Sequence, residues 1–246
     1  MSPPRLLERP SPNHGPRPDG AAVDILLLHY TDMARAEDAV ERLCDPAAQV
    51  SAHYVVAEDG RVWRLVDERR RAWHAGVSWW DGTADVNSHS VGIEIANPGH
   101  SHGYRPFPEV QMAAVESLCR QILARHPIPP HRVVGHSDVS VGRKIDPGHL
   151  FDWRRLAAAG IGLWPADASA CDLSDAEVAE ALADIGYRIE SPDSAHPATR
   201  AALSAFRRRW CPATLGATFD RDIAGMLKAV ANAVKKTRKI RCAHRG

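Results

Sequence analysis

The sequence predicts an α/β protein with a mixed central sheet flanked by helices, followed by a small C-terminal bundle of three helices. Two observations lead to this prediction. Apolar segments of strand length alternate with helical segments over residues 21–165, and two of the strands read as a hairpin. Beyond residue 172 the spacing of apolar residues becomes wholly helical.

The first structured elements are expected after a lead-in of twenty residues. The run 23–28 is apolar throughout, has the length of a buried strand and delivers His29 at its end. A helical stretch follows at 36–43. The segments 52–56 and 61–66, separated by a Glu-Asp-Gly turn, predict two adjacent antiparallel strands.

The segment 91–96 alternates as a half-buried strand does. Val91, Ile93 and Ile95 share one face, so Glu94 is expected to point away from the core. The next stretch, 108–125, predicts an amphipathic helix with apolar residues at every fourth position: Val110, Ala114, Leu118 and Ile122. A short strand at Val133-Val134 then leads into Gly135-His136.

The α/β domain is expected to span 21–165 and the helical bundle 172–234. A run of small residues after Pro165 reads as the linker. Ser174 and Glu177 match a capping box, and the helix that they open is closed by Gly186. Two further helices carry Leu203, Phe206 and Trp210, and then Ile223, Leu227, Val230 and Val234. These three helices are expected to form a bundle of their own.

Both ends of the chain have a biased composition. Residues 1–20 are rich in Pro and Arg, which predicts a flexible segment, and they contain no apolar core of a signal peptide. No run elsewhere has the length of a membrane span. The sequence therefore favours the cytoplasm, or the periplasm if the start is misassigned. Residues 235–246 form a basic tail.

Overall composition is that of an ordinary soluble protein. Of the 246 residues, 44% are hydrophobic and 25% charged, and the formal net charge of +1 excludes a strongly basic protein that coats nucleic acid. The five cysteines are scattered, odd in number and without a CxxC pair, which argues against a disulfide framework and a cysteine-rich zinc module.

The segment 135–148 has the densest set of polar residues. Lys144 and Asp146 are two positions apart, so in an extended chain both side chains face one cleft. If His136 and His29 reach that cleft from the ends of their strands, two imidazoles and one carboxylate converge. Zinc accepts these ligands, and three of them leave a fourth position for water, as in catalytic sites.

Several motifs, in order over roughly residues 23–165, resemble those of the type-2 N-acetylmuramoyl-L-alanine amidases, which are relatives of the peptidoglycan recognition proteins. The motifs are Leu28-His29-Tyr30-Thr31, Ser51-Ala52-His53-Tyr54, Ala72-Trp73-His74-Ala75-Gly76, Val91-Gly92-Ile93-Glu94 and the run from His136 to Pro147. The end of this region, 160–165, resembles the branch of the family that carries a C-terminal peptidoglycan-binding bundle. This implies a hydrolase that cuts the amide bond between N-acetylmuramic acid, including its 1,6-anhydro form, and L-alanine of the stem peptide.

The resemblance also implies roles for individual residues. It makes His29, His136 and Asp146 the ligands of one zinc ion per chain. Glu94 is then the general base, and Lys144 the cation that stabilises the oxyanion. The implied setting is peptidoglycan catabolism and cell-wall recycling, with muropeptides or peptidoglycan fragments as partners.

Substrate contacts are a further set of expectations. Arg143 has the planar fork that suits a carboxylate of the acidic stem peptide, and Asn97 is a second candidate for a peptide contact. Trp73 and His74 are expected on the sugar side, together with Trp79 and Trp80, for which core packing is the alternative.

Other interpretations stay open at the level of sequence. His53 and His74 either replace one ligand or, more in keeping with their positions, orient groups in the cleft. A non-catalytic peptidoglycan receptor on the same fold is the alternative function. A nucleic-acid-associated hydrolase is less favoured because no helix shows a recognisable reading motif. The sequence carries no signal for the oligomeric state.

Overall fold

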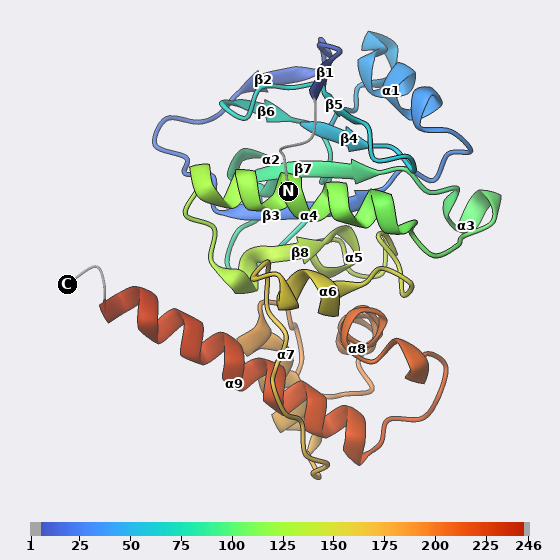
Figure 1. Ribbon diagram of the computed structural model, residues 1–246. Coiled ribbons are helices and arrows are strands. Elements are labelled where there is room, and N and C mark those ends of the chain that lie inside the picture. The colour runs from blue at the N-terminus through green and yellow to red at the C-terminus, as the bar shows by residue number, and fades with distance from the viewer. Residues whose placement is uncertain (1–5, 244–246) are drawn as a thin grey trace.

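The computed structural model describes residues 6–243, with side chains through residue 239 (Figure 1). Its centre is a six-stranded mixed sheet with the order β1-β5-β4-β7-β3-β8. The strands are β1 (Leu6–Glu8), β3 (Ile25–Tyr30), β4 (Tyr54–Val56), β5 (Val62–Arg64), β7 (Ser90–Ile95) and β8 (Val133–Gly135). Strands β4, β7, β3 and β8 are parallel, whereas β5 is antiparallel to β4. The predicted mixed α/β architecture is confirmed.

Helices lie on both sides of this sheet (Figure 1). In the sheet region they are α1 (Ala36–Cys44), α2 (Val86–His89), α3 (Gly99–His102), α4 (Glu109–Arg125), α5 (His136–Val139) and α6 (Trp153–Ala158), with the 3-10 turns η1 (Pro46–Ala48) and η2 (Pro130–Arg132). The strand before His29, the helix after it and the antiparallel hairpin agree with the sequence predictions. None of the described helices has the length and apolar character needed to cross a membrane.

The N-terminal segment is ordered within the described residues, so the prediction that it is flexible is wrong for residues 6–20. Strand β1 pairs in parallel with β5, and β2 (His14–Pro16) pairs with β6 (Arg70–Ala72) in a separate two-stranded sheet. The Arg17 guanidinium donates to the backbone carbonyls of Asn87 and Ser88. Both strands lie in a Pro- and Arg-rich stretch without an apolar run of strand length, and for this reason the sequence did not predict them. Residues 1–5 lie outside the described residues.

The two faces of β3 pack against different partners, as alternation along a strand requires. Leu26 and Leu28 join the core beneath α4. Ile25 and Leu27 pack with the C-terminal helices. His29 has the parity of Ile25 and Leu27, and it therefore projects from the face that the C-terminal helices partly cover.

Helix α4 buries Ala114, Leu118 and Ile122 as predicted, but Val110 does not belong to its buried face. Val110 is 53% exposed, whereas Met112, Val115 and Cys119 are buried. Successive residues of an α-helix are about 100° apart, so a strict every-fourth-residue row drifts by about 40° at each step. Val110 therefore falls about 120° away from Ile122 and leaves the apolar face.

Strand β7 is buried on both faces rather than on one, which corrects the half-buried prediction. Val91, Ile93 and Ile95 pack under α4 as expected. On the opposite face, a side chain at Gly92 would collide with the His74 ring, so this side of the strand is covered too. Glu94 points away from the α4 core, as predicted, into a partly enclosed cleft.

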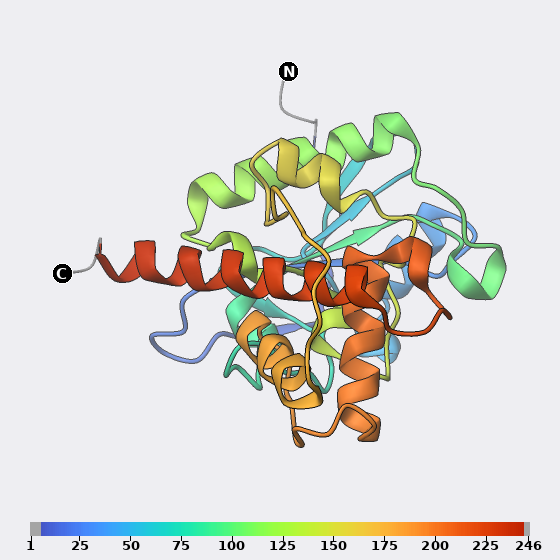
Figure 2. The same ribbon diagram turned by 90° about the horizontal axis from the view of Figure 1, so that it is seen from below.

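The C-terminal helices form where the sequence predicts them. They are α7 (Asp175–Ile185), α8 (Pro197–Trp210) and α9 (Arg221–Ala243), with the turn η3 (Pro212–Thr214) between the last two. The capping box of α7 is present. Viewed from below, α9 runs across the molecule past the ends of α7 and α8 (Figure 2).

Among the described residues, the core of this bundle is continuous with that of the sheet. Leu182, Phe206 and Leu227 belong to the same apolar cluster as Ile25 and Val134 of the sheet. Figure 1 shows the bundle beyond strand β8, at the edge of the sheet. The two predicted domains are therefore packed through a continuous core.

The predicted basic tail is also part of the fold over much of its length. Helix α9 continues through residue 243, and the Lys235 ammonium lies 2.7 Å from the Asp184 carboxylate. Arg238 makes an ion pair with Asp81 at 2.6 Å. Residues 244–246 lie outside the described residues.

Candidate metal centre

The carboxyl ends of three parallel strands bring the predicted ligands together. His29 lies near the end of β3, Glu94 near the end of β7, and His136 opens α5 directly after β8. Parallel strands end at the same edge of a sheet, and ligand sites of such sheets lie outside that edge. In the register of β3 and β7, His29 is paired with Glu94, so both side chains project from the same face.

Two imidazoles and one carboxylate converge at this edge. The Nδ1 atoms of His29 and His136 are 3.0 Å apart. The Oδ2 atom of Asp146 lies 3.2 Å from the first and 3.1 Å from the second. All three side chains are buried, and within the part of the chain that the structure describes they are the group suited to hold a metal ion.

The outer nitrogens of both rings have hydrogen-bond partners that determine the tautomer. His136 Nε2 lies 3.2 Å from the carbonyl oxygen of Ala75, to which it donates. His29 Nε2 lies 3.0 Å from Nδ1 of His74, whose Nε2 in turn lies 3.3 Å from the Ser90 hydroxyl. We assign protons to the outer nitrogens, which leaves a lone pair on each inner Nδ1.

The charges at the centre favour a bound cation. Burial, followed by the neighbouring His136, lowers the pKa of His29 to about 4, so its imidazole is neutral near pH 7. Burial raises the pKa of Asp146, but the neighbouring His136 and His29 outweigh it and hold that pKa well below its usual range. A neutral His29 imidazole and an ionised Asp146 carboxylate are in the protonation states that metal binding requires.

The residues present fit zinc. Tetrahedral zinc with bonds of about 2.0–2.2 Å places neighbouring donor atoms roughly 3.3–3.6 Å apart. The three donor atoms here are separated by 3.0, 3.1 and 3.2 Å, so an opening of a few tenths of an ångström accommodates the ion.

Glu94 lies in the same cleft with an unsatisfied oxygen. Its Oε2 atom is buried and has no hydrogen-bond partner among the described residues. Burial, and then the charge of Asp146, raise the pKa of Glu94 well above its usual range, while Lys144 lowers it. A carboxylate with a raised pKa accepts a proton more readily near neutral pH than an exposed one does.

The cleft itself has a volume of about 410 Å³. Lys144 is exposed and lines it together with Asp146, as predicted from their spacing. Sequence reasoning missed other lining residues, among them Tyr30, Asp32, Met33, Arg42, Ser51, His100 and Ser101. Tyr30 and Asp32 could have been inferred from their position just after His29. The residues from α1 and α3 come from distant segments that carry no such signal.

The predicted substrate-binding residues are not all in the cleft. Trp73, His74 and Arg143 line it. The Arg143 Nη2 also donates to the carbonyl oxygens of Ala75 and Val77, each at 2.9 Å, and so holds the loop that carries them. His74 also lies within hydrogen-bond distance of His29 and Ser90, which is the position of a residue that orients a ligand.

Asn97, Trp79 and Trp80 do not line the cleft. The buried Asn97 amide donates to the Arg105 carbonyl and accepts from the Gly99 N–H, so it shapes the loop around α3 and does not line the cleft. Trp80 is 2% exposed and packs against Tyr187 in the core. Trp79 is also absent from the lining of the cleft.

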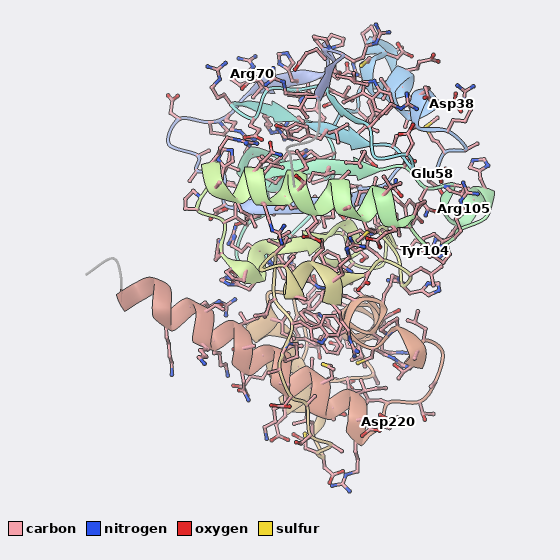
Figure 3. All side chains as sticks on the ribbon, in the orientation of Figure 1. Asp38, Glu58, Arg70, Tyr104, Arg105 and Asp220 are labelled. Atoms are coloured by element: carbon pink, nitrogen blue, oxygen red, sulfur yellow. The ribbon has the colours of Figure 1, made fainter. Side chains whose placement is uncertain are left out.

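One rim of the cleft is aromatic. Tyr104 stacks on His100 with ring centroids 4.4 Å apart, and the Tyr30 hydroxyl lies 2.8 Å from His100 Nδ1. Figure 3 shows Tyr104 and Arg105 on the same side of the molecule as Glu58, with which Arg105 forms an ion pair at 2.7 Å. This pair ties the α3 loop to the turn after β4.

A family model and several known proteins are similar to this chain. Residues 19–149 match the family model described as N-acetylmuramoyl-L-alanine amidase. The amidase AmiD of Escherichia coli is 34% identical over 234 residues, covering 85% of this chain and 82% of its own. The 1,6-anhydro-N-acetylmuramyl-L-alanine amidase AmpD of Haemophilus influenzae is 32% identical over 61% of this chain and 89% of its own length.

Solved structures extend the similarity to the C-terminal helices. AmpDh3 of Pseudomonas aeruginosa superposes with a TM-score of 0.79 at 32% identity, covering 91% of this chain and 95% of its own. AmiD in complex with anhydro-N-acetylmuramic acid-L-Ala-D-γ-Glu-L-Lys superposes with a TM-score of 0.76, covering 91% and 92%. The chain therefore belongs to the N-acetylmuramoyl-L-alanine amidase family.

Proposed function

We propose that this protein hydrolyses, with one zinc ion per chain, the amide bond between N-acetylmuramic acid, in its 1,6-anhydro form, and L-alanine of a stem peptide. The observation that carries this proposal is the convergence of His29 Nδ1, His136 Nδ1 and Asp146 Oδ2 in the cleft that holds a buried Glu94 oxygen, for which the described residues offer no hydrogen-bond partner. A receptor needs none of this chemistry, whereas hydrolysis of an amide needs an electrophile and a base at one point.

In this proposal the three donor atoms hold the zinc ion, which supplies a Lewis acid for the amide carbonyl. Glu94 accepts a proton from the attacking water at Oε2 and returns it to the alanine nitrogen as that nitrogen leaves. Its raised pKa suits both halves of this transfer.

Lys144 is proposed to stabilise the negative charge that develops on the carbonyl oxygen. Its exposed side chain lines the cleft close enough to Glu94 to lower the pKa of that carboxyl. Arg143 and Trp73 are proposed to contact the stem peptide and the sugar, respectively. Both line the cleft, and the ends of the Arg143 guanidinium that do not hold the 75–77 loop remain for a carboxylate.

The anhydro-muropeptide is proposed as substrate because two of the similar proteins are named or solved with this sugar form. The setting would be recycling or turnover of the cell wall, and the cytoplasm is the compartment that the sequence analysis favours. The C-terminal bundle stays a predicted glycan-binding module. Phe206, Trp210 and Leu227 are buried in it, so these apolar residues serve its packing.

The test combines metal analysis with cleavage of a purified anhydro-muramyl tripeptide. The full chain should contain one zinc ion and release the intact tripeptide, seen by mass spectrometry, and a chelator should abolish release. His136→Ala should lose zinc and activity together, because it removes one of three donors. Zinc without cleavage would favour a larger wall substrate or a receptor, and a chain without zinc would overturn the site.

A further inference from the structure

A second buried network lies directly behind the metal centre and joins it to the C-terminal bundle. Its centre is the Asp138 carboxylate on α5, two residues after His136, and Asp138 is 1% exposed. The Arg209 Nη1 of α8 donates to Asp138 Oδ2 at 3.0 Å. The Tyr187 hydroxyl, just after α7, donates to Asp138 Oδ1 at 2.7 Å.

The same carboxylate anchors the start of α5. The Gly135 N–H donates to Asp138 Oδ2 at 2.9 Å, and Arg209 Nη2 donates to the Val133 carbonyl of β8 at 3.1 Å. Helix α5 has only four residues, and a helix of that length is not stable by itself. Its position relative to β8 therefore depends on these tertiary hydrogen bonds.

Two of the three metal donors move with α5. His136 is its first residue. The Ser137 N–H donates to the Asp146 carbonyl at 2.8 Å, which ties the loop carrying the carboxylate to the same turn. Gly135 allows this close packing, because a side chain there would meet Pro147 at 2.8 Å. A shift of α5 would displace His136 and Asp146 together relative to His29.

Burial of the charged groups in this network costs hydration free energy, so stability alone does not explain the network. Asp138 and Arg209 form an ion pair in which both side chains are almost fully buried. Such a pair loses the hydration of two charges and is often no more stabilising than an apolar pair of the same volume. Arg209 also stacks on Trp153, with its guanidinium carbon 4.0 Å from the ring centroid, which fixes the direction of its donors. The ion pair therefore serves to fix the position of Asp138 relative to Arg209.

We propose that Arg209 and Tyr187, both contributed by the C-terminal bundle, are positioning residues for the metal centre. They hold Asp138, and through it the α5 turn that presents His136 and restrains Asp146. The bundle thus has a role in the zinc affinity of the sheet domain, separate from any binding of glycan. This inference rests on the proposed zinc site.

The experiment measures zinc affinity and not turnover. Arg209→Met removes both donors, Tyr187→Phe removes one hydroxyl, and Arg207→Met is the matched control. Arg207 is a buried arginine of the same helix, but it donates to Thr214 and Ala217 within the bundle. Zinc affinity is read by competition with a chromophoric chelator, and ligand geometry by the absorption spectrum of the cobalt-substituted chain.

Arg209→Met should weaken zinc binding by about 10- to 100-fold, as loss of groups that orient metal ligands does. Tyr187→Phe should weaken it by about threefold to tenfold, and both variants should alter the cobalt spectrum. Arg207→Met should bind zinc like the wild type even if it melts earlier. If Arg209→Met fails to fold, Tyr187→Phe decides by itself.

Two results would overturn the inference in distinguishable ways. If the wild type binds zinc and both test variants keep its affinity and cobalt spectrum while melting earlier, Arg209 and Tyr187 serve stability only, and the amidase proposal survives. If the wild type binds no zinc, the inference and the proposed function fail together.

Discussion

His29 and Glu94 are direct neighbours across two parallel strands, in the register that places both side chains on the same face of the sheet. One ring offers a metal donor, and the other residue ends in a buried oxygen without a hydrogen-bond partner among the described residues. The backbone pairing of β3 and β7 therefore fixes the spacing between one proposed metal ligand and the proposed base.

Glu94 is the first residue to test, because its proposed role in proton transfer can be separated from zinc binding. Glu94→Gln keeps the shape of the side chain but removes the proton acceptor, so turnover should fall by about 10²- to 10⁴-fold. Zinc content should remain at one per chain, since Glu94 is not among the three donors. Turnover is measured by release of tripeptide at saturating substrate. Near-normal turnover in this variant would exclude Glu94 as the base.

Lys144→Met should lower turnover without releasing the metal. The ammonium is proposed to meet charge that exists only in the transition state, so kcat should fall on the order of a hundredfold while KM changes little. Ile145→Met, at the next position of the cleft lining, is the control and should stay close to wild type. A rise in KM at constant kcat would instead make Lys144 a substrate-binding residue.

His74 should control how tightly the metal is held. Its Nδ1 accepts from His29 Nε2 at 3.0 Å, and this fixes which nitrogen of His29 faces the metal. His74→Phe removes the acceptor and should weaken zinc binding by about 10- to 100-fold, measured by chelator competition. Trp73→Phe, next to it in the chain and also in the cleft, should leave zinc affinity unchanged. Equal affinities in both variants would contradict the orienting role.

The sequence predicted the regular parts of the fold and the metal ligands for different physical reasons. Strand β3 has a clear apolar run and helix α7 a clear capping box, whereas β1 and β2 lie in a Pro- and Arg-rich stretch that shows neither signal. His29 and His136 were found because each follows an apolar strand inside a specific motif. The resemblance to the amidase motifs, together with position relative to strand ends, thus carried the information about the site.

Sequence reasoning did not predict the residues that hold those ligands in position. Asp138 is bound by Arg209, which lies 71 positions further along the chain, and no local pattern links the two. Asn97 illustrates the opposite failure. It follows the Glu94 strand in sequence, but its amide turns inward to backbone groups of the α3 loop. Proximity in sequence predicts which strand end a residue occupies and not where its side chain points.

Stability without metal should depend on pH through a buried histidine outside the metal centre. Burial, and then the charge of Arg17, lower the pKa of His53 to about 3, from about 6.5 in an unfolded chain. Between these two values the unfolded chain binds a proton that the folded chain does not. The part of the unfolding free energy that depends on neutral His53 is therefore fully present above about pH 6.5 and is lost as the pH falls toward 3.

His53→Gln isolates this contribution. One such histidine removes about 2 kcal/mol of unfolding free energy between pH 7 and pH 5, so the variant should lose about 2 kcal/mol less than the wild type over that interval. Urea unfolding at both pH values, with a chelator present, measures the difference. The variant should be less stable at pH 7, because His53 accepts from the Gly92 N–H and lies 3.1 Å from the Arg70 carbonyl. The exposed His102→Gln is the control and should keep the wild-type dependence on pH. An equal loss in His53→Gln and wild type would mean that His53 takes up its proton in the folded chain.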